Sequence, residues 1–321
     1  MVDNTTQFEA PLPNHCSGPI NGEIVMRGER HSGTNWIRKI MSDNLVIGES
    51  TNKTKILMDS EDFGWKHGFL YPDGWGKPIS ENEFLVIITR DVFTWLPKMF
   101  NNTYDHIMNR KRYLGFSKFI REESVGVCHE GRSTKPQRCR EFNKKRNSPA
   151  YEKAANIIQL RTLKYKQWLS NDPAEASYVG PNKDSFVKNR IHIRLESLTT
   201  TDQKDGDNGI SPIDLQRQYV REPLRDHCVL MSDNFTATLT HTNQWASKHE
   251  KKVKGESRNG KKKVDVKEER RKLLEVYSKE DLRYVLDQLD LDFEKQLGYD
   301  YGYIHEMLRD EDSSVSLSQQ L

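Results

Sequence analysis

Residues 28–35, Gly-Glu-Arg-His-Ser-Gly-Thr-Asn, have the composition and spacing of a loop that binds a phosphate group. The short apolar run 23–26 precedes them, and residues 34–44, whose apolar positions have helical spacing, follow them. In a strand–loop–helix unit of this kind, backbone N–H groups of the loop and of the helix N-terminus point at the anion. An ordinary turn between a strand and a helix is the alternative interpretation of the pattern.

The two positions after Gly33 distinguish this loop from that of a nucleotide hydrolase. The Gly-x4-Gly spacing is shared, but hydrolases then need a lysine for the β- and γ-phosphates and a Ser or Thr hydroxyl for Mg²⁺. Thr34 and Asn35 occupy these two positions. The loop therefore predicts a site for a nucleotide phosphate without a triphosphate-bound metal ion, and it argues against a P-loop kinase or hydrolase.

Alternating strands and helices are predicted around this loop. They favour an α/β fold with a mainly parallel central sheet, covered on both faces in three layers. The clearest strand is Phe84–Thr89, which is continuously apolar and β-branched, as a buried parallel strand should be. Ser278 is the predicted N-cap of a helix that carries Leu282 to Leu289, and Gly298 is a predicted helix stop. The other predicted strands are 55–58 and 191–195, and the other predicted helix is 151–169.

Most of the chain, residues 23–305, is predicted to form a single domain. A lead-in with several Pro and Gly residues, 1–22, precedes it. The segment 105–148 is basic and poor in apolar residues, and it is predicted to be an insertion beside the site. The polar residues 306–321 are predicted to form a disordered tail.

Composition predicts a soluble protein, because no run of about 18 apolar residues could cross a membrane. The N-terminus does not have the pattern of a signal peptide.

The formal net charge is only +3, but residues 110–146 hold twelve Lys or Arg against four Asp or Glu, and residues 248–272 hold twelve against five. Such clusters suit anionic partners, and solvated surface explains either one equally well. The four cysteines match no metal-binding spacing; Cys128 and Cys139 either form a disulfide in an oxidising compartment or remain two thiols.

Residues 30–36, Arg-His-Ser-Gly-Thr-Asn-Trp, resemble the 5′-phosphosulfate loop of sulfotransferases that use PAPS (3′-phosphoadenosine 5′-phosphosulfate). That loop is usually Pro-Lys-Ser-Gly-Thr-Thr-Trp, so His31 stands at the family's lysine. Arg90 is similar to the arginine of the family's second signature, Arg-Asn-Pro-x-Asp, with Asp91-Val92 replacing Asn-Pro and Lys98 standing at the later serine. Weaker similarities are those of 195–198 to Tyr-Glu-Asp-Leu and of 297–299 to a closing Leu-Gly-Tyr.

The resemblance implies the P-loop-like sulfotransferase fold and a set of site residues. His67, 23 residues before Arg90, is implied to be the general base, a task that suits an imidazole. Lys66 is implied to neutralise charge on the sulfuryl oxygens, and a surface lysine is the equal alternative. Glu29 and His31 are reserve bases. The implied ligands of PAPS are Arg30, His31, Ser32, Gly33, Thr34, Asn35, Arg90 and Lys98, and a late basic-Gly stretch, 254–255 or 258–261, is a further candidate for the 3′-phosphate.

The function implied is transfer of a sulfuryl group from PAPS to a hydroxyl of an acceptor, with PAP (3′-phosphoadenosine 5′-phosphate) as the product and no metal ion. The basic insertion favours an acidic glycan as acceptor, as a hypothesis from charge alone. A catalytically degenerate protein of this fold that binds PAP or a glycan is the main rival. Nucleic-acid binding is not favoured, because the chain lacks an aromatic-interleaved or groove-binding motif. The absence of an anchor favours the cytoplasm and the basic insertion favours the Golgi lumen, so both stay open.

Overall fold

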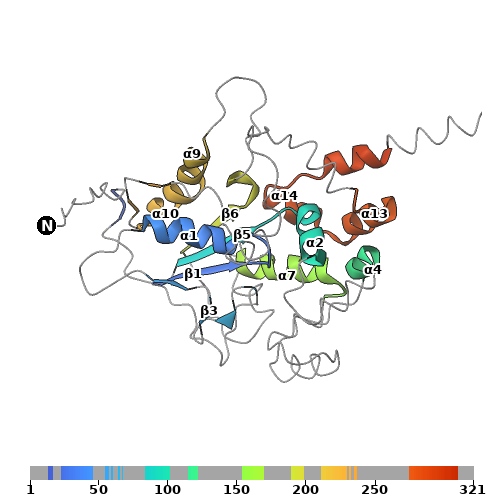
Figure 1. Cartoon of the computed structure of the whole chain (residues 1–321), viewed down its shortest axis with the longest axis horizontal. Coiled ribbons are helices and arrows are strands. Elements are labelled where there is room, and N and C mark those ends of the chain that lie inside the picture. The colour runs from blue at the N-terminus through green and yellow to red at the C-terminus, as the bar shows by residue number, and fades with distance from the viewer. Residues whose placement is uncertain are drawn as a thin grey trace, which may run out of the picture. The chain divides into compact units, whose positions relative to one another are not determined.

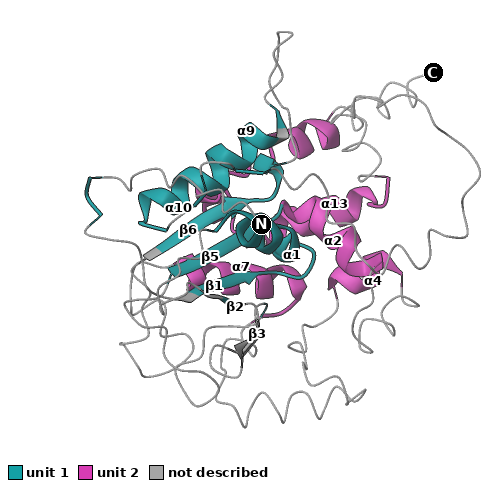
Figure 2. Cartoon of the chain, turned by 60° about the vertical axis from the view of Figure 1, so that its left-hand side comes forward, with its two compact units in different colours: residues 1–90, 182–269 teal, residues 91–181, 270–321 magenta. Residues whose placement is uncertain are grey.

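A computed structural model of the 321-residue chain describes residues 14–16, 23–45, 55–57, 59–60, 64–65, 67, 84–101, 115–121, 154–169, 189–198, 211–229, 231–232, 235–236 and 275–309. The chain forms two compact units, each made of two separate stretches of sequence (Figure 2). The first unit contains residues 1–90 and 182–269, and the second contains 91–181 and 270–321. Both units take residues from the span 23–305, whose assignment to one domain stays a prediction.

The first unit is built on a parallel sheet flanked by helices, so the predicted α/β class is confirmed (Figure 1). Its described strands lie in the order β2-β1-β5-β6, and each neighbouring pair is parallel. All six residues of the inner strand β5 are buried, as its continuous apolar sequence predicts. The strands are β1 (Glu23–Gly28), β2 (Lys55–Leu57), β5 (Phe84–Thr89) and β6 (Asn189–Arg194), and a short antiparallel pair is formed by β3 (Asp59–Ser60) and β4 (Gly64–Trp65).

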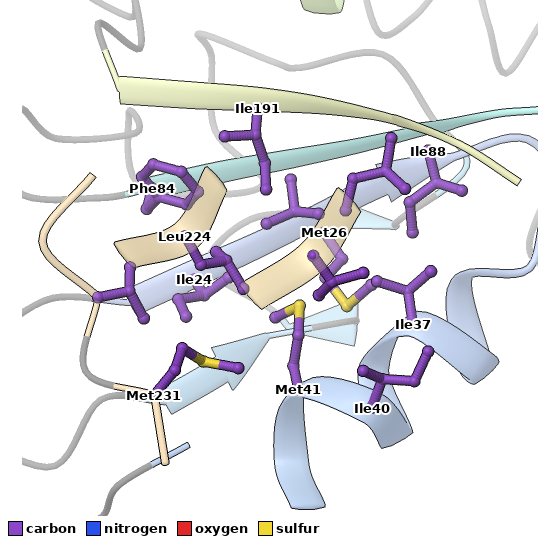
Figure 3. Close-up of a cluster of buried hydrophobic side chains, with 14 of the residues drawn as sticks. Ile24, Met26, Ile37, Ile40, Met41, Phe84, Ile88, Ile191, Leu224 and Met231 are labelled. Atoms are coloured by element: carbon purple, nitrogen blue, oxygen red, sulfur yellow. The ribbon is translucent and has the colours of Figure 1, made fainter. Parts of the chain in front are cut away.

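One face of this sheet packs against helix α1 (Thr34–Asn44) and helix α10 (Glu222–Asp226), as Figure 3 shows. Successive side chains of a strand point to opposite faces, so the cluster takes every second residue of the strands. The cluster includes Ile24, Met26, Phe84, Val86, Ile88, Ile191 and Ile193 of the sheet, with Ile37, Ile40, Met41 and Leu224 of the helices. Burial of each such side chain stabilises the fold by about 1.5–3 kcal/mol. This packing holds the first turn of α1 next to the end of β1.

The segment 212–226 is helical throughout and consists of α9 (Pro212–Gln216), the π-helical turn η3 (Arg217–Arg221) and α10. A disulfide joins Cys228, just after this segment, to Cys16 of the lead-in. The pair Cys128 and Cys139, considered from the sequence, lies outside the described residues.

Helices make up the described part of the second unit (Figure 2). They are α2 (Val92–Asn101), α4 (Phe116–Arg121), α7 (Ile157–Leu169), α13 (Lys279–Gln288), α14 (Leu291–Gln296) and residues 302–309. Of the predicted insertion 105–148 the structure describes only 115–121, and of the predicted tail 306–321 only 306–309, which are helical.

Local capping decides where three of these helices begin. Ser278 caps α13 as predicted, through a capping box in which its hydroxyl accepts from the Asp281 N–H at 3.1 Å. The predicted start of α7 at residue 151 is wrong, because the side chain of Asn156 accepts from the N–H groups of residues 158 and 159 and so begins the helix at Ile157. The helix that follows Ser278 ends before Leu289, because Asp290 caps a new helix, α14.

A buried ion pair joins α7 to α14. Arg161 and Glu294 are both inaccessible to solvent and form a salt bridge, and the Tyr301 hydroxyl donates to Glu294 at 2.9 Å. The Arg161 guanidinium lies 4.7 Å from the centre of the Tyr165 ring. Burial alone would lower the pKa of Arg161. The charge of Glu294, its hydrogen bond and the nearby Tyr165 and Tyr301 together outweigh burial and raise this pKa well above its ordinary value.

Candidate functional site

The loop 28–35 connects β1 to α1, as the sequence predicts. Gly33 is the N-cap of α1 and makes no side-chain capping bond, and no acidic residue lies in the first turn of this 11-residue helix. The N-terminus of a helix carries a partial positive charge, and nothing within this helix neutralises it. The arrangement is therefore that of an anion-binding helix start, with the backbone of Thr34 and Asn35 at its entrance.

Both glycines of the loop are required by their surroundings. A Cβ atom at Gly28 would lie 2.5 Å from the Ser32 hydroxyl oxygen and 2.8 Å from the Ile88 carbonyl oxygen. Gly33 has a φ of 89°, which other residues rarely adopt, and a Cβ there would lie 2.4 Å from a methyl carbon of Leu195. The Gly-x4-Gly spacing thus reflects close packing of the loop on β5 and on the end of β6.

Ser32 shapes the loop from inside. Its side chain is fully buried, and its hydroxyl and backbone N–H both donate to the Glu29 carbonyl, at 2.6 and 3.0 Å. Both donors of Ser32 therefore stabilise the turn. The predicted contact of Ser32 with a phosphosulfate stays a prediction.

Arg90 reaches the loop from the end of β5. Its guanidinium Nη1 donates to the His31 carbonyl at 2.8 Å, although the two residues are 59 positions apart in sequence. The register of the sheet pairs Gly28 with Ile88, so both segments leave the sheet at the same edge. His31 has a φ of 62°, and its carbonyl is directed to Arg90 from this left-handed conformation. The positively charged guanidinium group of Arg90 therefore lies against the loop at His31.

His67 is buried beside the start of the same loop. Its Nδ1 lies 2.5 Å from the Gly28 carbonyl oxygen. A carbonyl oxygen only accepts hydrogen bonds, so Nδ1 carries a proton. In the neutral ring the lone pair is then on Nε2, which is the form that a general base needs.

The remaining predicted site residues differ in burial and in the unit to which they belong. Arg30 is half-buried within the loop, and the reserve base Glu29 is buried there. Lys98 lies on α2 of the second unit with its side chain exposed. Lys66 and the two late basic-Gly stretches, 254–255 and 258–261, lie outside the described residues.

Two polar residues that the sequence did not single out lie at the same edge of the sheet. Thr89 Oγ1 and His192 Nε2 are 2.7 Å apart, and Thr89 is paired in register with Arg194. The signal for His192 is the alternation in β6, where Arg190, His192 and Arg194 are interleaved with core isoleucines. Burial lowers the pKa of Arg190 on this face.

Taken together, the loop, Arg90 and His67 place a helix N-terminus, a guanidinium group and an oriented imidazole around one edge of the sheet. Such a set can bind a phosphate or sulfate ester and accept a proton beside it. Within the part of the chain that the structure describes, no helix is long and apolar enough to cross a membrane. Comparisons with protein-family models, curated proteins and solved structures gave no match to this chain.

Proposed function

We propose that this protein is a PAPS-dependent sulfotransferase with the three-layer, P-loop-like fold of that family, which transfers a sulfuryl group to a hydroxyl of an acceptor. One observation carries the proposal. Arg90 and His67, which are far from the loop in sequence, each donate a hydrogen bond to one of its backbone carbonyls. These are the two side chains that the resemblance assigns to the 3′-phosphate and to the base, and their contacts with the same loop support the proposal.

The residues of the loop would bind the 5′-phosphosulfate. The backbone of Gly33, Thr34 and Asn35 and the positive end of α1 favour a dianionic ester, and Arg30 or a protonated His31 would stand in for the lysine of the family loop. Arg90 would contact the 3′-phosphate through its guanidinium group, whose planar fork of donors suits a phosphate. Lys98 is a second, weaker candidate for that phosphate.

The donor supplies an activated sulfuryl group with PAP as the leaving group. His67 would take the acceptor's hydroxyl proton on Nε2, while the bond from Nδ1 to the Gly28 carbonyl holds the ring in place. As the acceptor oxygen bonds to sulfur, the bond between sulfur and the phosphate oxygen breaks. Lys66 would stabilise charge that develops on the sulfuryl oxygens.

Calorimetric titration with PAP, followed by measurement of PAP release from PAPS with a panel of acceptors, tests the proposal. Arg90→Ala should weaken PAP binding by one to two orders of magnitude, as is usual when a charged hydrogen bond worth about 1.5–3 kcal/mol is lost. His67→Ala should bind PAP normally and lose PAP release by roughly 10²–10⁴-fold. Lys39→Ala is the control. This exposed lysine lies on α1, and among the described residues it forms a salt bridge with Asp43 of the same helix.

The outcomes separate the proposal from its rival. No heat with PAP would refute the nucleotide site. PAP binding without release for any acceptor would favour the catalytically degenerate alternative, and release unchanged in His67→Ala would remove His67 from its role. The panel should pair anionic with neutral oligosaccharides, because an acidic glycan acceptor is predicted only from the charge of residues 110–146.

A further inference from the structure

Two His-Cys dipeptides, His15-Cys16 and His227-Cys228, lie in the two separate stretches of sequence that make up the first unit. The fold brings them together: Cys16 and Cys228, 212 positions apart, form a disulfide with their Cα atoms 5.6 Å apart. One ligand atom each of His15, Cys16 and Cys228 lies within 4.8 Å of the other two. The three side chains therefore form a compact cluster that the site at the loop does not use.

His15 makes a hydrogen bond of the kind that metal-binding histidines make. Its Nε2 lies 2.7 Å from the Asp226 carbonyl oxygen, so Nε2 carries the proton and the lone pair of the neutral ring is on Nδ1. Histidines that bind metal ions usually donate their other ring N–H to a carbonyl or carboxylate, which fixes the tautomer and the ring orientation. The Asp226 carbonyl supplies that contact in this protein.

The dimensions of the cluster suit a tetrahedral ion. With Zn–S bonds of about 2.3 Å and Zn–N bonds of about 2.0–2.1 Å, neighbouring ligand atoms in a tetrahedral site lie about 3.5–3.8 Å apart. Once the disulfide is broken, its sulfur atoms need only separate to this distance. His15 is exposed and both cysteines are half-buried, so a reductant and a metal ion can reach them.

Cys228 occupies a backbone position that normally belongs to glycine. Its φ is 64°, its N–H donates to the Arg225 carbonyl, and the next N–H, of Val229, donates to the Leu224 carbonyl. This is the Schellman ending of a helix, in which the left-handed residue is usually glycine because any Cβ is strained there. Glycine is therefore the residue that would remove the Cys228 sulfur and still suit this backbone conformation.

We propose that His15, Cys16 and Cys228 form a redox-controlled site for a thiolate-binding divalent cation, of which Zn²⁺ is the fitting example. In the oxidised protein the disulfide excludes the ion. A dithiol reductant gives two electrons and two protons to the disulfide and becomes a disulfide itself. Zn²⁺ then displaces the two thiol protons and is held by two thiolates and His15 Nδ1, with water in the fourth position.

Metal titration of the full chain in its two redox states tests this inference without any enzyme assay. The oxidised protein, and protein reduced with a water-soluble phosphine under argon, are titrated with Co²⁺ as a spectroscopic probe and then with Zn²⁺. We expect the reduced protein to bind one equivalent with thiolate-to-cobalt charge-transfer absorption that Zn²⁺ abolishes, and the oxidised protein to show none. His15→Gln should weaken Zn²⁺ binding on the order of tenfold or more.

Two variants control for misfolding and for metal binding by the other two cysteines. Cys228→Gly removes a ligand but suits the left-handed backbone, so it should remain folded and lose the cobalt spectrum. The double variant Cys128→Ser/Cys139→Ser should keep the spectrum, because neither residue belongs to the cluster. Absence of charge-transfer absorption in the reduced wild type, or its persistence in Cys228→Gly, would overturn the proposal and leave the disulfide a purely structural link.

Discussion

Replacing Arg161 by methionine should destabilise the second unit far more than replacing Lys166 by methionine. Both cations lie on α7 and both pair with a carboxylate at α14, so the two changes remove the same kind of contact from the same helix pair. They differ in burial, because Arg161 and Glu294 are 0% exposed whereas Lys166 and Asp290 are 41% and 38% exposed.

The magnitudes follow from this difference. Without Arg161, the buried Glu294 carboxylate keeps the Tyr301 hydroxyl as a donor, but it loses its counter-charge. Breaking a buried ion pair from one side costs about 3–5 kcal/mol, whereas an exposed pair contributes about 0.2–1 kcal/mol. The double variant Arg161→Met/Glu294→Gln should recover a large part of the loss, since no charge is then left buried.

Urea denaturation, followed by circular dichroism for the four proteins, measures these effects. With a slope of about 1–3 kcal/mol per molar urea, Arg161→Met should lower the midpoint of the second unit's transition by at least about 1 M, and Lys166→Met by a fraction of that. Equal midpoint shifts for the two single variants, or no recovery in the double variant, would refute the reasoning from burial.

Three further predictions concern single positions. Gly33→Ala should weaken PAP binding at least tenfold in calorimetry, because its Cβ would collide with Leu195 and strain a left-handed backbone. Asn44→Leu should cost about 1–3 kcal/mol in thermal unfolding, since the buried amide of Asn44 accepts from the Thr236 N–H at 2.6 Å and donates to its carbonyl at 3.0 Å. Burial alone would raise the pKa of Asp281, but its hydrogen bonds with Arg121, Ser117 and the Ser278 backbone, with the charge of Arg121, together lower this pKa. The stability that Asp281 contributes should therefore be complete above about pH 4 and decline as acid protonates the folded state. Asp281→Asn should show a smaller loss of stability in acid, measured by melts at stepped pH.

Several elements were predictable because their signals are local. The continuous apolar sequence of β5, the helical spacing of α1 and the Ser278 cap each act within a few residues, and the structure has all three. Where a capping side chain competes with helix propensity, the pattern of apolar residues misleads. Asn156 and Asp290 redirect backbone hydrogen bonds to their own side chains, and so each starts a helix inside a stretch that was predicted to be continuous or to begin earlier.

By itself the sequence determined the strand–loop–helix unit at 23–44, because glycine spacing and apolar periodicity act between near neighbours in the chain. Only the tertiary structure decided which distant groups meet. Arg90 meets His31, His67 meets Gly28, and Cys16 rather than another thiol meets Cys228. Strand order and register determine these contacts. Order and register depend in turn on the packing of the whole sheet and its helices, which a short stretch of sequence does not specify.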